Sequence, residues 1–211
     1  MADPRFRLPE GGEIGWRTLA DGARLRTFRL PHPAPAARIL LLSGRADYLE
    51  KWARTLGDMQ ARGLAVAAFD WRGQGLSSGR PRNGAGHIDR FETWLDDLAQ
   101  MLPWAEEALG GPVIPLGHSM GGHLLLRHLV ADPRSVPAAI LTAPFCGFVQ
   151  PLAASRGLAR LARLMVQLGR GTSFAPGQKP FGAYRMATGR MALLTSDPEQ
   201  FADEGRWVAD R

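Results

Sequence analysis

The sequence has very little cysteine and no long apolar run. Cys146 is the only cysteine among 211 residues, so no internal disulfide can form, and nothing points to an oxidising compartment. Apolar runs such as residues 39–42 are far shorter than the ~20 residues of a membrane-spanning helix. Residues 1–12 lack the basic-then-apolar pattern of a signal peptide. We therefore expect no membrane span and predict a cytoplasmic location.

Lysine is also scarce, because Lys51 and Lys179 are the only lysines among 26 basic residues. The net charge of +6 comes from arginines that are scattered along the chain, with no basic run interleaved with aromatic residues. This pattern indicates a solvated basic surface and argues against nucleic acid as a partner. The charge favours at most a transient contact with an anionic membrane surface, or acidic substrates. No oligomeric state is predicted.

The order of apolar segments predicts an α/β fold. Residues 14–30 alternate in polarity and contain Asp21-Gly22, which indicates a hairpin of two edge strands. After them, continuous apolar stretches alternate with segments of helical periodicity, as in parallel strands joined by crossover helices. We therefore predict a doubly wound, mostly parallel sheet. The expected strands are residues 36–43, 64–70, 113–116 and 138–142, and the expected helices are residues 48–62, 91–109 and 120–131.

The character of the sequence changes after residue 145. We expect a terminal arm at residues 1–13, an α/β core at 14–145 and a partial helical cap or lid at 146–211. Within the last region, residues 152–168 have helical periodicity with arginines at the polar positions. A glycine and proline loop follows, and Ser196 to Glu199 resembles the start of a further short helix.

The sequence around Ser119 carries the clearest chemical signal. Residues 117–121, GHSMG, fit G-x-S-x-G between an apolar strand and an apolar helix. In this pattern a sharp turn holds the serine in a strained conformation with its hydroxyl exposed. We expect Gly117 and Gly121 to be needed because the residues on either side of such a turn crowd each other. The alternative is a glycine turn without chemistry.

Three separated motifs resemble the α/β-hydrolase family, in particular its monoacylglycerol lipase and lysophospholipase branch of the serine aminopeptidase S33 type. They are SGRADYLEKW at residues 43–52, DWRGQGLS at 70–77 and GHSMGG at 117–122. The resemblance implies that Ser119 is the nucleophile and that the backbone N–H groups of Met120 and Arg45 form the oxyanion hole. General geometry agrees, since one such donor follows the nucleophile and the other comes from a loop after an earlier strand.

Other polar residues of these motifs are expected to have structural roles. We predict that Asp70 fixes its loop by capping or pairing, and that His87 is a hydrogen-bonded loop residue. His118 lies next to the nucleophile, but its ring is expected to point away from the serine hydroxyl. Gly73-Gln74-Gly75 lacks the third glycine and the helix start of a dinucleotide site. No cluster with metal-ligand spacing is present, so no cofactor and no metal are predicted.

A general base for Ser119 is not evident in the sequence. In this fold an acid and then a histidine follow the serine, yet His123 and His128 are the only histidines after it. No acid lies between Ser119 and His123, and His128 is expected to point elsewhere. The resemblance implies that the acid and the base lie on later strands of a core that is incomplete here. We therefore expect either a fragment of a longer enzyme or a truncated chain with little activity.

Two function classes follow. The first is a serine hydrolase of carboxylic esters, acting on acyl-glycerol or lysophospholipid substrates through an acyl-enzyme on Ser119. The second is a noncatalytic fold that binds lipid or a partner protein. A proline-type aminopeptidase of the same fold is a further enzymatic alternative. Aspartate-nucleophile enzymes of the fold are disfavoured, because a serine occupies the nucleophile position.

Overall fold

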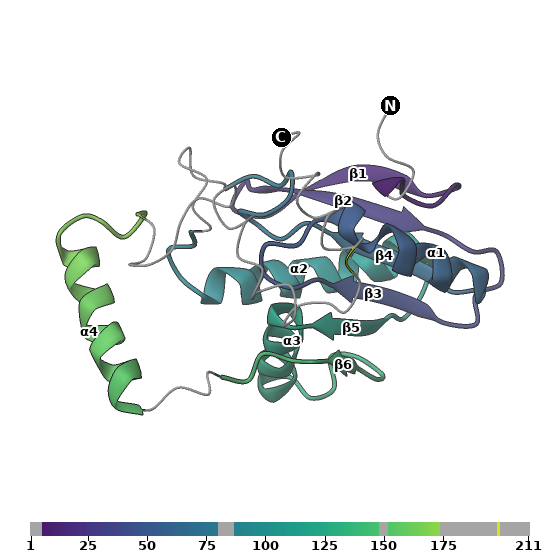
Figure 1. Cartoon of the computed structure of the whole chain (residues 1–211). Helices are drawn as coiled ribbons and strands as arrows, with labels where there is room; N and C mark the ends of the chain where they lie inside the picture. The colour runs from purple at the N-terminus through teal and green to yellow at the C-terminus, as the bar shows by residue number, and fades with distance from the viewer. Residues whose placement is uncertain (1–5, 80–86, 148–151, 174–197, 199–211) are drawn as a thin grey trace. The chain divides into compact units, whose positions relative to one another are not determined.

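A mixed sheet of six strands forms the centre of the protein, in the order β1-β2-β4-β3-β5-β6 (Figure 1). The computed structural model describes residues 6–79, 87–147, 152–173 and 198. The chain divides into a core unit, Met1–Arg80 with Gly86–Phe148, and a C-terminal unit, Pro81–Ala85 with Val149–Arg211. All six strands belong to the core unit.

The last four strands in this order run parallel, as predicted. They are β3 (Arg38–Leu42), β4 (Ala65–Phe69), β5 (Ile114–His118) and β6 (Ile140–Thr142). Strands β3 and β4 read as continuous apolar runs because their side chains are covered on both faces of the sheet. Since parallel strands share one direction, their carboxyl ends lie at one edge of the sheet, and this edge carries the candidate site.

The predicted hairpin is present, but the prediction of two edge strands was wrong for one of them. Strands β1 (Glu13–Thr18) and β2 (Arg24–Leu30) pair antiparallel, and β1 lies at the edge. Strand β2 also pairs antiparallel with β4, with Thr27 opposite Phe69. Arg26 and Thr27 are buried polar residues in β2. Because these residues are polar, the sequence pattern did not indicate that the strand lies inside the sheet.

Helices cover both faces of the sheet. The 3-10 helix η2 (Leu49–Trp52) and α1 (Ala53–Ala61) connect β3 to β4, α2 (Glu92–Leu109) connects β4 to β5, and α3 (Met120–Ala131) connects β5 to β6. Alternate residues of β3 face opposite layers, because Leu40 and Leu42 pack with residues of α2 and α3 while Ile39 and Leu41 pack with Leu56 of α1. The core is therefore two apolar layers, one on each side of the sheet.

The described part of the C-terminal unit contains α4 (Leu152–Gln167), which confirms the predicted helix at residues 152–168. The further short helix expected to start at residues 196–199 lies outside the described residues, apart from residue 198. None of the described helices combines the length and the apolar character needed to span a membrane.

Candidate active site

Ser119 lies at a strained turn between β5 and α3. Its backbone has φ 51° and ψ −113°, a conformation that residues with a side chain rarely adopt. The residue is half-buried, so its side chain is not sunk in the core. Strand β5 ends at His118 and α3 begins at Met120, which leaves Ser119 alone at the bend. This is the strand-turn-helix geometry that the G-x-S-x-G pattern predicts.

The glycines around Ser119 allow close backbone contacts, and one of them is the expected contact across the turn, because a Cβ atom on Gly117 would lie 3.0 Å from the carbonyl carbon of Gly121. A Cβ atom on Gly117 would lie 2.7 Å from Cα of Gly122. A Cβ atom on Gly121 would lie 2.3 Å from the carbonyl oxygen of Leu42 and 2.6 Å from that of Ser43. A side chain on Gly121 itself would collide with the end of β3, a contact that the sequence did not predict. Its absent side chain lets α3 begin directly against the neighbouring strand.

The loop at residues 43–47 lies beside the nucleophile. A Cβ atom on Gly44 would be 3.3 Å from Cβ of Ser119, and the N–H of Gly121 donates to the carbonyl oxygen of Ser43 at 3.1 Å. Within the loop, the N–H of Gly44 donates to Oδ2 of Asp47 at 2.9 Å. Asp47 also pairs with Nζ of Lys51 at 2.7 Å. Residues 43–47 thus form a hydrogen-bonded turn that packs against the elbow.

Strained backbone is concentrated at this edge of the sheet. Among the described residues, three other than glycine have positive φ, and they are Ala46, Ser119 and Ala143. Each follows the carboxyl end of a parallel strand, namely β3, β5 and β6. The elbow is also tied to the last of these segments, because the N–H of Ser119 donates to the carbonyl oxygen of Thr142 at 3.2 Å. Such clustering is typical of functional sites, where surrounding contacts hold unfavourable conformations.

The two residues predicted to supply oxyanion-hole N–H groups flank this turn. Arg45 is an exposed residue of the loop between Gly44 and Ala46, and Met120 is the first residue of α3, with its side chain buried. The first N–H groups of a helix have no acceptor within the helix, which leaves that of Met120 free of intrahelical bonds. The N–H of Ala46, next to Arg45, is held by Oε1 of Gln74. The catalytic role of both N–H groups stays a prediction.

The histidines occupy positions that suit structural roles. Nδ1 of His118 lies 3.2 Å from Oγ1 of Thr142, and its ring packs edge-on against Trp52. His87 bonds Asp89 at 2.8 Å, as expected for a loop residue. The His123 ring packs edge-on against Phe91 with the centroids 5.5 Å apart. In the part of the chain that the structure describes, no histidine is hydrogen-bonded to the Ser119 hydroxyl, so these residues supply no assembled base.

A network of buried charged side chains holds the segment that follows β3. Arg26 of β2 donates from both terminal nitrogens to Glu50, at 3.1 and 2.5 Å, and lies 3.5 Å from Asp70. Asp70 also accepts the N–H groups of Leu49 at 2.8 Å and Leu76 at 3.0 Å. The structural role predicted for Asp70 is therefore confirmed. Sequence reasoning missed Arg26 and Glu50, although a charged residue between the apolar positions of a strand could have marked the first of them.

Burial has the largest effect on the pKa of Asp70. It raises the pKa of Asp70 to about 6, against the opposing effects of the Leu76 N–H, the Arg26 charge and the Leu49 N–H. Because the folded pKa lies above the ordinary value of 3.8, the folded state binds this proton more tightly than the unfolded chain does. The resulting stabilisation is present below pH 3.8 and is lost as the pH rises through about 6.

A substitution of Asp70 by asparagine tests this sign. Asparagine does not titrate, so the free energy of unfolding of the wild type, minus that of D70N, is expected to fall by about 2–3 kcal/mol between pH ~4 and pH ~7. Urea unfolding of both proteins at a series of pH values measures the difference. A difference that increases over this range would show that ion pairing with Arg26, rather than burial, controls the Asp70 carboxyl.

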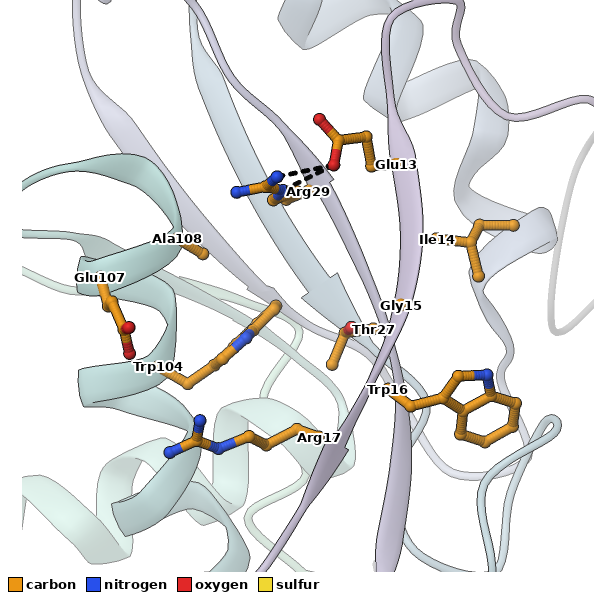
Figure 2. Close-up of a pocket in the computed structure, with 10 residues that line it drawn as sticks. All are labelled: Glu13, Ile14, Gly15, Trp16, Arg17, Thr27, Arg29, Trp104, Glu107 and Ala108. Carbon is orange, nitrogen blue, oxygen red and sulfur yellow. Dashed lines mark hydrogen bonds and ion pairs between the residues drawn. The ribbon is translucent and has the colours of Figure 1, made fainter.

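A pocket of about 420 Å³ lies elsewhere in the core unit (Figure 2). It is formed by β1, β2 and the end of α2, with Arg17, Thr27 and Trp104 among its lining residues. Glu13 and Arg29 form an ion pair of 2.6 Å at its rim. None of its lining residues belongs to the elbow or to residues 43–47, so the pocket is not the space in front of Ser119. Across the described residues, no group of three metal-ligating side chains was found.

The mostly parallel sheet and the strained serine between a strand and a helix define an α/β hydrolase. The family model described as serine aminopeptidase, S33, matches residues 33–203, and the chain therefore belongs to this family of hydrolases. The match covers the loop at residues 43–47, the DWRGQGLS motif and the elbow.

Known relatives support the same family. The chain is 30% identical over 158 residues to a Haemophilus influenzae protein named probable lysophospholipase L2, a match that covers 74% of this chain and 49% of the relative. It is 35% identical over 115 residues to lysophospholipase L2 of Escherichia coli K12, which covers 53% of this chain and 33% of the relative. The chain thus spans about half or less of the length of these relatives.

A solved structure shows the same fold. The chain resembles a soluble variant of monoglyceride lipase from Saccharomyces cerevisiae, solved with a substrate analog, with a TM-score of 0.59 and 22% sequence identity. The match covers 80% of this chain and 56% of that chain. At this level of identity the comparison supports the α/β-hydrolase architecture.

Proposed function

We propose that the protein hydrolyses carboxylic esters through a covalent acyl-enzyme on Ser119. The Ser119 oxygen attacks the carbonyl carbon of the ester, and the carbonyl electrons move to its oxygen, which becomes an oxyanion. The N–H groups of Met120 and Arg45 stabilise that charge. The oxyanion then collapses, the bond between the carbonyl carbon and the alcohol oxygen breaks, and the alcohol leaves with the proton that the Ser119 hydroxyl gave up. Water then attacks the acyl-enzyme in the same way, which breaks the bond to Ser119, returns a proton to its oxygen and releases the fatty acid. The observation that carries the proposal is the positive φ of a half-buried serine at the elbow.

The substrate class rests on the relatives rather than on the geometry. The names lysophospholipase and monoglyceride lipase both describe enzymes that cleave a single acyl ester from a glycerol-based lipid. We extend this substrate class to the present protein and assign residues 146–211 as part of a cap over the site. Neither the nucleophile nor the oxyanion hole calls for a metal or an organic cofactor, because the charge is stabilised by backbone N–H groups.

A fluorophosphonate probe tests the nucleophile directly. In the protein expressed from its complete reading frame, the probe is expected to label the wild type but not S119A, and S119A is expected to lose turnover of p-nitrophenyl esters by about 10⁴-fold or more. The matched control is S135A, which removes a hydroxyl that bonds the carbonyl oxygen of Asp132 in a turn outside the site. Equal labelling of wild type and S119A would overturn the assignment.

The absence of a histidine bonded to Ser119 in the described residues favours one alternative, a noncatalytic protein. In that case wild type and S119A would show the same background turnover. The aminopeptidase alternative is tested in the same assay by adding a proline p-nitroanilide. Cleavage of this amide in preference to glycerol esters would move the function to that class.

A further inference from the structure

The pocket of about 420 Å³ between β1, β2 and α2 has a hydroxyl group without a partner at its floor (Figure 2). Gly15 and Thr27 lie opposite each other in the antiparallel pair of β1 and β2. Thr27 is 4% exposed, yet among the described residues its hydroxyl has no hydrogen-bond partner. A Cβ atom on Gly15 would lie 3.2 Å from Oγ1 of Thr27, so the glycine leaves this hydroxyl uncovered. Because a buried hydroxyl without a partner is unfavourable, the floor favours a polar ligand.

Two arginines lie on either side of this floor. Residues two apart on a strand share a face, so Arg17 of β1 and Arg29 of β2 lie on the same side of the sheet as Thr27. Arg29 donates to Glu13 from Nε at 3.1 Å and from Nη2 at 2.6 Å, which leaves its Nη1 without a partner. Within the described part of the chain, Arg17 forms no ion pair. Two guanidinium groups can therefore donate to one anion, and their geometry suits a phosphate.

The α2 side of the pocket carries groups that attract a cation. Trp104 packs against the apolar layer on this side of the sheet and remains partly exposed. Glu107 follows three residues later, so the two side chains are neighbours on the helix surface (Figure 2). Glu107 is exposed, and its carboxylate pairs with none of the described cations. An indole face beside a carboxylate is a favourable place for an ammonium or quaternary ammonium group.

We propose that this pocket binds a small zwitterion that carries a phosphate and an ammonium or quaternary ammonium group, as phosphocholine does. The phosphate contacts the two guanidinium groups and the Thr27 hydroxyl, and the cation lies against Trp104 near Glu107. Two arginines and two glutamates line the pocket, so their charges cancel and match a ligand without net charge. The volume of about 420 Å³ is within the usual range for small-molecule sites.

The proposed binding site is distant from the nucleophile. Strands β2, β4 and β3 lie between β1 and β5 in the sheet. At ~4.8 Å for each neighbouring pair, the pocket and the elbow are roughly 19 Å apart across the strands. The proposal therefore adds a second site and does not depend on ester hydrolysis. We expect S119A to bind the zwitterion as the wild type does.

Isothermal titration calorimetry of the full chain tests the proposal with phosphocholine, inorganic phosphate and choline. Phosphocholine is expected to bind about tenfold or more tightly than either of the other two, because only it contacts both sides of the pocket. The variant R17Q should weaken phosphocholine and inorganic phosphate about tenfold. E107Q should weaken phosphocholine and choline similarly and leave inorganic phosphate unchanged.

The matched control is R54Q. Arg54 is exposed on α1, which covers the other face of the sheet, so its loss should change binding less than twofold, on the order of the experimental error. Equal affinity of R17Q and R54Q for phosphocholine would overturn the proposal. So would a wild-type protein that binds phosphocholine no more tightly than choline or inorganic phosphate.

A third variant tests the floor of the pocket. G15V places methyl groups over the Thr27 hydroxyl and should weaken phosphocholine by about tenfold or more. Gly15 has no positive φ and valine is favourable in a strand, so the melting temperature should stay near that of the wild type. A stable G15V protein that binds phosphocholine normally would place the ligand elsewhere and contradict the assignment.

The source of the zwitterion is distinguished with phosphatidylcholine vesicles. Vesicle binding that is lost in R17Q would assign the phosphocholine group to a lipid headgroup. Binding of dissolved phosphocholine without binding of the vesicles would assign it to a free solute. Both results support the same pocket, whereas a wild-type protein that binds neither at ~10 mM would overturn it.

Discussion

Replacing Gly121 by alanine is expected to destabilise the protein by about 3–5 kcal/mol. The new Cβ would lie 2.3 Å from the carbonyl oxygen of Leu42 and 2.6 Å from that of Ser43. Both oxygens belong to backbone at the end of β3, where the chain pairs with β4 and β5, so they cannot move aside as a flexible side chain would. The hydrogen bond between the Gly121 N–H and the Ser43 carbonyl would also be strained. Urea unfolding measures the loss of stability.

Gly57 provides a matched control for this substitution. It lies in α1, has no positive φ, and a Cβ there would meet nothing closer than Cγ of Pro9 at 4.0 Å. G57A is therefore expected to stabilise the protein by about 0.5–1 kcal/mol, because alanine loses less backbone entropy than glycine in a helix. If G121A were as stable as the wild type, α3 would not begin against β3 as the structure has it.

The elbow and the parallel strands could be predicted from the sequence because their signals are local. The apolar runs at β3 and β4 and the G-x-S-x-G pattern each lie within a few adjacent residues, and they define the strand-turn-helix without reference to the rest of the chain. The predicted crowding is present at Gly117, which faces Gly121 and Gly122, but the main reason for a glycine at position 121 was not predicted. Its contact is with β3, about 80 residues earlier in the chain, and no local pattern reports such a contact.

The buried charge network and the bonds between loops near the candidate site could not be predicted for the same reason. Arg26, Glu50 and Asp70 come from β2, η2 and the segment after β4, and they meet only because β2 inserts between β1 and β4. The bond between Gln74 and the N–H of Ala46 likewise joins two loops that are distant in sequence. Hydrophobic periodicity indicates which residues are buried, but it does not say which buried charges are partners.

Removal of the Asp97 carboxylate is expected to cost about 3 kcal/mol of stability. Asp97 lies on α2 and is fully buried, and both of its oxygens accept from Arg72, at 3.0 and 2.6 Å. Arg72 belongs to the DWRGQGLS loop, which also contains Gln74. The variant D97L would leave the Arg72 charge largely buried, with only the exposed Asp21 as its partner. Thermal and urea unfolding should both report the loss.

Two comparisons distinguish an unpaired charge from a simple packing defect. D21A removes the other partner of Arg72, but Asp21 is 51% exposed, so this change should cost about 1 kcal/mol or less. The double variant R72M/D97L removes the charge together with its partner, and it should recover much of the stability lost in D97L, because an apolar pair can replace a buried ion pair. If the double variant were less stable than D97L, the loop would depend on the shape and hydrogen bonds of Arg72 itself. If instead the double variant recovers stability, the loss in D97L comes from leaving the Arg72 guanidinium without its carboxylate partner.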